Sequence, residues 1–148
     1  MRKCSNGPSR ASSRTDGGYP RRVSEPASPR VLFADDDPIL HRLLEVNFRV
    51  AGITLESVGR GDDALARVVT APPDALVLDA TMPGMDGHEV FQRLRAEPGL
   101  ATLPVIFLTG RGAEEFDAYA GEHVRVVTKP FDPSELVEIV LDAMGIGG

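Results

Sequence analysis

The chain of 148 residues has an ordinary soluble composition, with 42% hydrophobic and 26% charged residues, and it is long enough for one domain with a sizeable core. No apolar run approaches the roughly 18 residues of a membrane span, and no apolar segment follows the basic first residues, which excludes a membrane helix and the usual secretory signal. The single cysteine, Cys4, excludes an internal disulfide, so we expect a cytoplasmic protein.

Charge divides the chain into two parts. Residues 1–29 carry six basic and two acidic side chains, a net charge of +4, which leaves −10 for the remainder of a chain whose total is −6. Because large apolar side chains are almost lacking in residues 1–29, we predict a disordered basic tail there and one domain over residues 30–145. An acidic domain does not favour nucleic-acid binding, which depends on the neutralisation of phosphates by lysine and arginine.

Short apolar runs alternate with amphipathic stretches along the predicted domain. Strands are predicted at residues 31–34, 53–58, 75–78, 105–108 and 124–127. Helices are predicted at residues 38–50, 61–69, 88–96, 114–120 and 133–144. This alternation is typical of an α/β fold, in which helices cover both faces of a doubly wound, five-stranded parallel sheet. Since only residues 146–148 follow the last helix, we expect a chain without an output module.

Two of the predicted helices have clear start signals. Asp37 before Pro38, and Asp132 before Pro133, fit a capping carboxylate followed by proline at the first helical position. The apolar positions of the first helix are then Leu40, Leu43, Leu44 and Val50. The three histidines, His41, His88 and His123, show no partner pattern and are predicted to be surface residues.

Polar side chains follow four of the five predicted strands. Asp35 and Asp36 follow the first strand, Asp79 the third, Thr109 the fourth and Lys129 the fifth. If the strand order is 2-1-3-4-5, the ends of the first and third strands are neighbours at the edge where α/β sheets bind ligands. Three carboxylates crowded there would repel one another, and a hard divalent cation such as Mg²⁺ would neutralise them.

Thr109 and Lys129 add a hydroxyl donor and a fixed positive charge to this edge. Together with Mg²⁺ they suit a phosphoryl group, whose transfer depends on charge neutralisation and in-line positioning. A carboxylate can act as the nucleophile and form an aspartyl-phosphate. Asp79 is the candidate, because Asp35 and Asp36 come as a pair suited to the metal.

Four short motifs in this order resemble the receiver domain of bacterial two-component response regulators, over residues 31–144. They are Phe33-Ala34-Asp35-Asp36-Asp37-Pro38, Leu78-Asp79-Ala80-Thr81-Met82-Pro83-Gly84-Met85-Asp86-Gly87, Leu108-Thr109-Gly110 and Thr128-Lys129-Pro130-Phe131. The resemblance implies the flavodoxin-like (βα)5 fold with strand order 2-1-3-4-5.

Site roles also follow from the resemblance. It implies that Asp79 accepts the phosphoryl group, that Asp36 binds Mg²⁺ directly and Asp35 through water, and that the Thr81 carbonyl is a further ligand. It implies that Thr109 and Lys129 contact the phosphoryl oxygens. It also implies a cis bond between Lys129 and Pro130, where proline makes the cis form accessible.

We expect a stand-alone regulator, and the resemblance implies that it is phosphorylated by a histidine kinase or histidine phosphotransfer protein and signals by protein–protein contact. Such a protein phosphorylates and dephosphorylates itself and is not a conventional turnover enzyme. We expect a monomer or weak dimer, without a nucleic-acid or membrane partner. The alternative within the family is a phosphate sink, which competes for kinase flux without a readout.

Two alternatives outside the family have weaker support. The Gly59-Arg60-Gly61-Asp62-Asp63-Ala64 stretch matches the spacing of a dinucleotide-binding loop. Its two aspartates occupy the helix start where a pyrophosphate would have to bind, and like charges repel there. A metal-dependent phosphatase with Asp79 as nucleophile would usually need an acid–base carboxylate two residues later, where this chain has Thr81.

The chain departs from its family in the region after Thr109. The position three before Lys129 usually holds an aromatic residue that moves with phosphorylation, and here it is Val126. The interval from Thr109 to Lys129 is 20 residues, a couple shorter than is typical, and the loss falls in the predicted helix at residues 114–120. We therefore expect phosphorylation to change this face only modestly.

Overall fold

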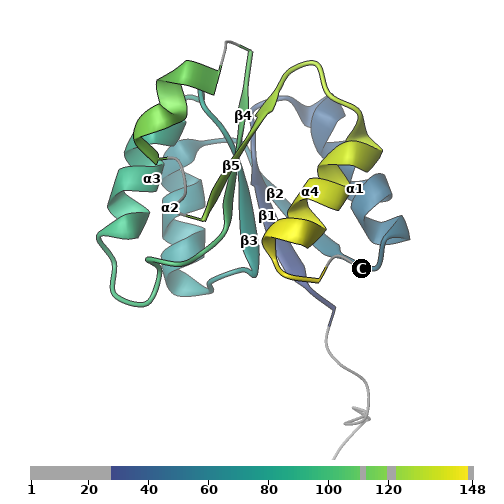
Figure 1. Ribbon diagram of the computed structural model, residues 1–148, viewed down its shortest axis with the longest axis horizontal. Helices are drawn as coiled ribbons and strands as arrows, with labels where there is room; N and C mark the ends of the chain where they lie inside the picture. Colours follow the sequence, from purple (N-terminus) through teal and green to yellow (C-terminus); the bar gives the residue numbers. More distant parts are fainter. Residues whose placement is uncertain (1–27, 111–112, 120–122, 147–148) are drawn as a thin grey trace, which may run out of the picture.

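A computed structural model describes residues 28–110, 113–119 and 123–146 of the chain (Figure 1). The prediction of a disordered tail over residues 1–29 lies outside the described residues except at its last two positions. There the Pro29 carbonyl accepts a hydrogen bond from the Thr54 N–H at 2.9 Å, so the chain is already bound to the sheet edge at this point. None of the described helices is both long and apolar enough to cross a membrane.

Five parallel strands form one sheet in the order β2-β1-β3-β4-β5, which confirms the predicted topology. The strands are β1 (Arg30–Ala34), β2 (Thr54–Val58), β3 (Ala75–Asp79), β4 (Val105–Thr109) and β5 (Val124–Thr128). Every predicted strand is present, with ends that move by at most one residue. All residues of β3 and β4 are buried, because strands in the middle of a doubly wound sheet are covered on both faces.

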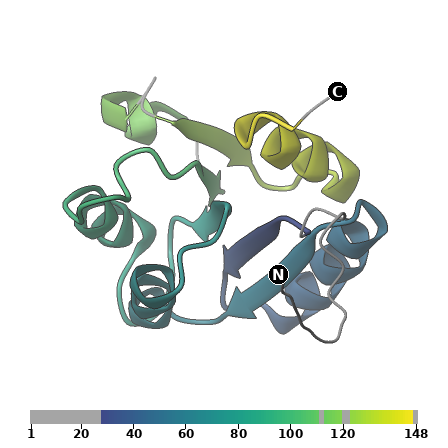
Figure 2. The same ribbon diagram turned by 90° about the horizontal axis from the view of Figure 1, so that it is seen from below.

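Helices cover both faces of the sheet (Figures 1 and 2). They are α1 (Pro38–Val50), α2 (Gly61–Thr70), α3 (Gly87–Arg95), the short 3₁₀-helix η2 (Ala113–Tyr119) and α4 (Pro133–Ala143). In Figure 1, α1 and α4 lie on one face, while α2 and α3 lie on the other. Phe116 of η2 packs into the core on the α2 and α3 side. The predicted helix at residues 114–120 is thus a 3₁₀-helix, the form in which short helical pieces commonly occur.

The predicted caps are confirmed at both proline-initiated helices. The Asp37 side chain accepts from the Ile39 N–H at 2.9 Å, and the Asp132 side chain accepts from the Ser134 N–H at 2.9 Å. Each carboxylate thus binds a backbone N–H that the first turn of a helix leaves without a partner. This fixes where the chain turns from β1 into α1, immediately beside the polar edge of the sheet.

The predicted apolar face of α1 is wrong in part. Leu44 is buried, but Leu43 and Val50 are 46% and 84% exposed, and Phe48 fills the core position instead. The helix has more apolar residues than one face can hold, so the sequence pattern alone could not select the buried stripe. The result is a set of apolar side chains left on the outer surface of α1.

Candidate functional site

The first part of the site lies where β1 ends. Asp35 is only 1% exposed, and its Oδ1 accepts a hydrogen bond from the Asp37 N–H at 2.9 Å. Its own N–H donates to the Val58 carbonyl at 3.0 Å, so the residue is still held by the sheet. Asp36, next in the chain, is exposed to solvent. The pair thus offers one fixed carboxylate and one accessible carboxylate.

Asp79 is the last residue of β3 and is 7% exposed. Its Oδ1 accepts from the Thr81 N–H at 3.2 Å. The loop after it folds back tightly, because a Cβ at Gly87 would lie only 2.5 Å from the Asp79 carbonyl oxygen. Glycine at that position therefore lets the start of α3 pack directly against the end of β3, which holds Asp79 at the edge of the sheet.

Lys129 brings a positive charge between the two buried carboxylates. Its Nζ lies 3.1 Å from Asp35 Oδ2 and 3.5 Å from Asp79 Oδ2. The Lys129 N–H donates to the Thr109 carbonyl at 2.7 Å, and the bond to Pro130 is cis, as the resemblance implied. These contacts direct the lysine stem from the end of β5 across the end of β4 toward β1 and β3.

Burial and charge have opposite effects on the ionisation of this group of side chains. Burial raises the pKa of Asp79, and the nearby negative charge of Asp35 raises it further, against the lowering effects of the Thr81 N–H and Lys129. For Lys129, burial lowers the pKa, but the hydrogen bond to Asp35 and the attraction of Asp79 outweigh it, so the pKa is raised. Lys129 is therefore charged at neutral pH, whereas ionisation of Asp79 is unfavourable in free energy.

The carboxylates can together hold a cation. Asp35, Asp36 and Asp79 each offer an oxygen, and the three oxygens lie within 4.8 Å of one another. An all-oxygen donor set with excess negative charge fits a hard divalent cation such as Mg²⁺ better than zinc or copper. The Thr81 side chain is exposed, and the role of its carbonyl as a further ligand stays a prediction.

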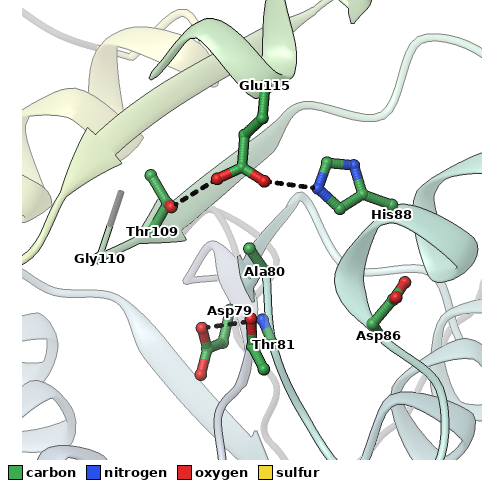
Figure 3. A pocket seen from close by; sticks show the side chains of 8 residues that line it. All are labelled: Asp79, Ala80, Thr81, Asp86, His88, Thr109, Gly110 and Glu115. Atoms are coloured by element: carbon green, nitrogen blue, oxygen red, sulfur yellow. Dashed lines mark hydrogen bonds and ion pairs between the residues drawn. The ribbon is translucent and has the colours of Figure 1, made fainter. Parts of the chain in front are cut away.

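Thr109, the last residue of β4, is 3% exposed and is held by a residue that the sequence did not single out. Its hydroxyl donates to Glu115 Oε2 at 3.1 Å, and Glu115 Oε1 lies 3.2 Å from His88 Nε2 (Figure 3). These side chains and Asp79, Thr81 and Asp86 line a cavity of about 480 Å³. Thr109 and Asp79 thus line the same cavity.

The prediction that all three histidines are surface residues is wrong for His88 and His41. His88 is half-buried against Phe116 and Tyr119, and His41 is half-buried and contacts the Asp35 carbonyl through Nε2. Only His123 is exposed. Neither Glu115 nor His88 belongs to a motif, and the one available signal was their position close to Thr109 and Asp79 in the chain.

The glycine-rich stretch before α2 packs against its own fold. A Cβ at Gly61 would lie 1.7 Å from the Met85 carbonyl oxygen, so this glycine lets α2 approach the loop after β3. At the start of α2, the Asp62 side chain accepts from the Asp63 N–H at 3.1 Å and pairs with Arg60 at 3.1 Å. The spacing that resembles a dinucleotide loop therefore serves close backbone packing, beside a helix start that already carries a carboxylate.

Comparison with known proteins assigns a family to this arrangement. Residues 31–141 match the family model described as response regulator receiver domain. The chain is 36% identical over 114 residues to the DNA-binding dual master transcriptional regulator RpaA of Synechocystis sp., covering 74% of this chain and 46% of the relative. It is 37% identical over 111 residues to the DNA-binding response regulator MtrA of Mycolicibacterium smegmatis, covering 73% of this chain and 47% of the relative. The chain thus spans about half the length of these curated relatives.

Solved structures agree with the sequence comparison. A response regulator receiver domain from Francisella superposes with a TM-score of 0.72 at 29% identity, covering 80% of this chain and 98% of that one. The receiver domain of a sensor histidine kinase from Pseudomonas aeruginosa superposes with a TM-score of 0.71 at 27% identity, covering 80% of this chain and 99% of that one. The latter structure has a magnesium ion coordinated in its active-site cleft.

Proposed function

Because the chain belongs to the response regulator receiver domain family, we propose that Asp79 accepts a phosphoryl group from a histidine kinase or histidine phosphotransfer protein. The observation that carries this proposal is Lys129 Nζ at 3.1 Å from Asp35 and 3.5 Å from Asp79, where Asp79 and Thr109 line the same cavity. Receiver domains are regulators and not conventional turnover enzymes. We place the domain at residues 30–145 and its action in the cytoplasm.

The proposed chemistry uses the side chains of three strand ends. A carboxylate oxygen of Asp79 forms a bond to phosphorus while the bond between phosphorus and the donor histidine nitrogen breaks, and the histidine leaves. The Lys129 ammonium pairs with a phosphoryl oxygen, and the Thr109 hydroxyl donates a hydrogen bond to another. These groups offset the charge on the transferred phosphoryl, which is the main contribution that proteins make to such reactions.

Asp35, Asp36 and Asp79, with the Thr81 carbonyl, are the residues that we propose to hold Mg²⁺. When bound, Mg²⁺ supplies positive charge that offsets the carboxylates and the phosphoryl oxygens. The support is the grouping of the three carboxylate oxygens within 4.8 Å, and the raised pKa of Asp79, whose burial and proximity to Asp35 make its negative charge costly. A cation removes this cost and favours the ionised nucleophile.

We propose that the phosphodonor binds along the outer surface of α1. Ile39, Leu43, Val46 and Val50 are 78%, 46%, 53% and 84% exposed and recur at the spacing of one helix face. This apolar stripe begins one turn from Asp36, so a partner helix lying on it would reach the mouth of the site. Exposed apolar groups of this kind commonly mark interaction sites. The longer relatives RpaA and MtrA are DNA-binding regulators, whereas for this domain we propose a protein partner.

The first test is intact-mass spectrometry after incubation with acetyl phosphate and Mg²⁺. We expect one added phosphoryl group on the wild-type chain and none on Asp79→Asn, which keeps the shape of the side chain and removes the nucleophilic carboxylate. Equal labelling of the variant would refute the assignment of Asp79. Labelling that does not depend on Mg²⁺ would refute the metal assignment.

A second test addresses the partner surface. With a histidine kinase that phosphorylates the wild-type chain, we expect Leu43→Ser to slow transfer by about tenfold, since loss of one buried apolar contact costs roughly 1–2 kcal/mol. Phosphorylation by acetyl phosphate should be unchanged, because this small donor does not contact α1. The matched control is Val69→Ser, which changes an apolar residue that is 44% exposed on α2. Equal slowing by both variants would place the partner elsewhere.

A further inference from the structure

A chain of polar contacts leads from Thr109 to the surface of the domain. The Thr109 hydroxyl donates to Glu115 Oε2 at 3.1 Å, Glu115 Oε1 lies 3.2 Å from His88 Nε2, and His88 Nδ1 lies 3.1 Å from the Tyr119 hydroxyl (Figure 3 shows the first two contacts). These contacts therefore join the end of β4, the 3₁₀-helix η2 and the first turn of α3. We refer to Glu115, His88 and Tyr119 as the latch residues.

The hydrogen-bond donors and acceptors match at each of these contacts when the His88 imidazole is neutral. If His88 carries its proton on Nε2, it donates to Glu115 and accepts from the Tyr119 hydroxyl through Nδ1. The Glu115 carboxylate then accepts from Thr109 with one oxygen and from His88 with the other. The carboxylate is thus fixed at both oxygens, although its side chain is 31% exposed.

Aromatic packing holds the latch residues in place. The His88 ring stacks on Phe116 with a centroid distance of 4.9 Å and an interplanar angle of 8°, and it also stacks on Phe107 at 5.9 Å. Phe116 is 1% exposed and Phe107 is fully buried. A side chain packed among such rings cannot turn without displacing its neighbours, so a change at Glu115 must also affect the contact between η2 and α3.

We propose that the latch residues hold the Thr109 hydroxyl in the unphosphorylated protein, and that phosphorylation of Asp79 opens this latch. This proposal rests on the proposed function. A hydroxyl has a single proton, so Thr109 cannot donate to Glu115 and to a phosphoryl oxygen at the same time. Glu115 and Asp79 also line the same cavity, where a carboxylate would repel an incoming phosphoryl group.

The latch gives the domain a path from site to surface that does not pass through Val126. The expectation of a modest change was drawn from Val126 and from the short interval after Thr109. In the structure, however, the rings that surround the polar chain come from α3, β4 and η2, and Val126 is a half-buried neighbour of this cluster. Opening of the latch would therefore change the surface formed by η2 and the first turn of α3.

The test is a titration with beryllofluoride, a mimic of the phosphoryl group, at saturating Mg²⁺, and binding is monitored by NMR. Glu115→Ala should tighten beryllofluoride binding about three- to tenfold, since a partly exposed hydrogen bond to a charged group no longer competes. His88→Phe keeps an aromatic ring and removes both of its hydrogen bonds, and it should tighten binding in the same direction. The control, Glu114→Ala, removes an exposed acid of the same 3₁₀-helix and should leave the affinity unchanged.

A second measurement follows the ring nitrogens of His88 in the same titration. In the wild-type chain their chemical shifts should change as beryllofluoride saturates the site, and in Glu115→Ala the change should be small because the latch is already open. Tighter binding by Glu115→Ala with no change, or a loss, for His88→Phe would overturn the latch and indicate simple charge repulsion. Unchanged His88 signals at saturation would also overturn it.

Failure of the proposed function gives a different result. If Asp79 does not accept a phosphoryl group, the wild-type chain and all three variants would show neither beryllofluoride-induced shifts around Asp35 and Asp79 nor an added phosphoryl group by mass. The latch would then lack its ligand and would fail with the function. Saturation of the site with signals unchanged beyond Asp35, Asp79 and Thr109 would overturn the latch alone and favour a phosphate sink without a readout.

Discussion

Removal of one carboxylate from the cation site tests both the repulsion in the site and its role as a metal site. Asp36 is the residue to change, because it is exposed, whereas Asp35 and Asp79 are buried. We expect Asp36→Ala to be more stable than the wild-type chain without Mg²⁺ and less stable with it. A crossing of this kind distinguishes a metal site from an ordinary surface aspartate.

The size of the gain without Mg²⁺ follows from the geometry. The Asp36 oxygen lies within 4.8 Å of an oxygen of Asp35 and of Asp79. At the dielectric constant of water each repulsion is about 0.9 kcal/mol, and at an effective value of 20 it is about 3.5 kcal/mol. Since Asp36 is exposed and Lys129 already pairs with the other two carboxylates, we take the lower figure and expect a net gain of about 1 kcal/mol.

The effect of Mg²⁺ has the opposite sign. At a concentration one hundred times its dissociation constant, a cation that binds only the folded state stabilises that state by about 2.7 kcal/mol. The wild-type chain should gain this amount, and Asp36→Ala should gain little because it has lost an accessible ligand. The variant should therefore melt about 3–5 °C higher than the wild-type chain in EDTA and several degrees lower in Mg²⁺.

The assay is thermal unfolding followed by circular dichroism, in EDTA and at increasing Mg²⁺ concentrations. Glu138→Ala is the control, because it removes the same charge from an exposed position of α4. It should leave the response to Mg²⁺ unchanged. An equal Mg²⁺-induced gain in wild-type and Asp36→Ala chains would mean that the cation binds elsewhere. A lower melting temperature of Asp36→Ala in EDTA would refute the repulsion argument.

Three further predictions concern the residues around Asp79. Burial and the charge of Asp35 raise the pKa of Asp79 above its ordinary value of 3.8, so ionisation of Asp79 destabilises the folded state. Without Mg²⁺, the wild-type chain should match Asp79→Asn in stability below pH 3.8 and become the less stable of the two as the pH rises through the raised pKa. A constant difference in stability from about pH 3 to pH 8, measured by chemical denaturation, would contradict this. In Gly87→Ala the new Cβ would lie 2.5 Å from the Asp79 carbonyl oxygen, so this variant should lose about 1–3 kcal/mol of unfolding free energy and be phosphorylated more slowly. In the control Gly110→Ala the space is open, and both the stability and the phosphorylation rate should change less. Thr81, which is exposed, and Arg111, which lies outside the described residues, resemble the family positions that flank the approach of water. Exchange of Thr81 should alter the rate of dephosphorylation more than the rate of phosphorylation when both are followed by mass spectrometry. Parallel changes of the two rates would show an effect on the site as a whole.

The sequence by itself determined the sheet and the position of its polar edge. Short apolar runs bounded by turn residues, such as those of β3 and β4, indicate central strands, and the carboxyl ends of parallel strands meet at one edge of the sheet. That rule brings Asp35, Asp79 and Lys129 within hydrogen-bond or ion-pair distance, although 94 residues separate Asp35 from Lys129. Local signals also fixed the starts of α1 and α4, since capping depends on residues adjacent in the chain.

Only the tertiary structure decided which side chains meet away from the strand ends. The choice of Phe48 over Val50 for the core depends on the rotation of α1 against the sheet, because both residues are apolar. The contact of Thr109 with Glu115, and of Glu115 with His88, depends on how η2 and α3 are placed beside each other. Such contacts join separate elements and follow no sequence period, so the polar chain that leads from the site to the surface could be found only once the helices were packed.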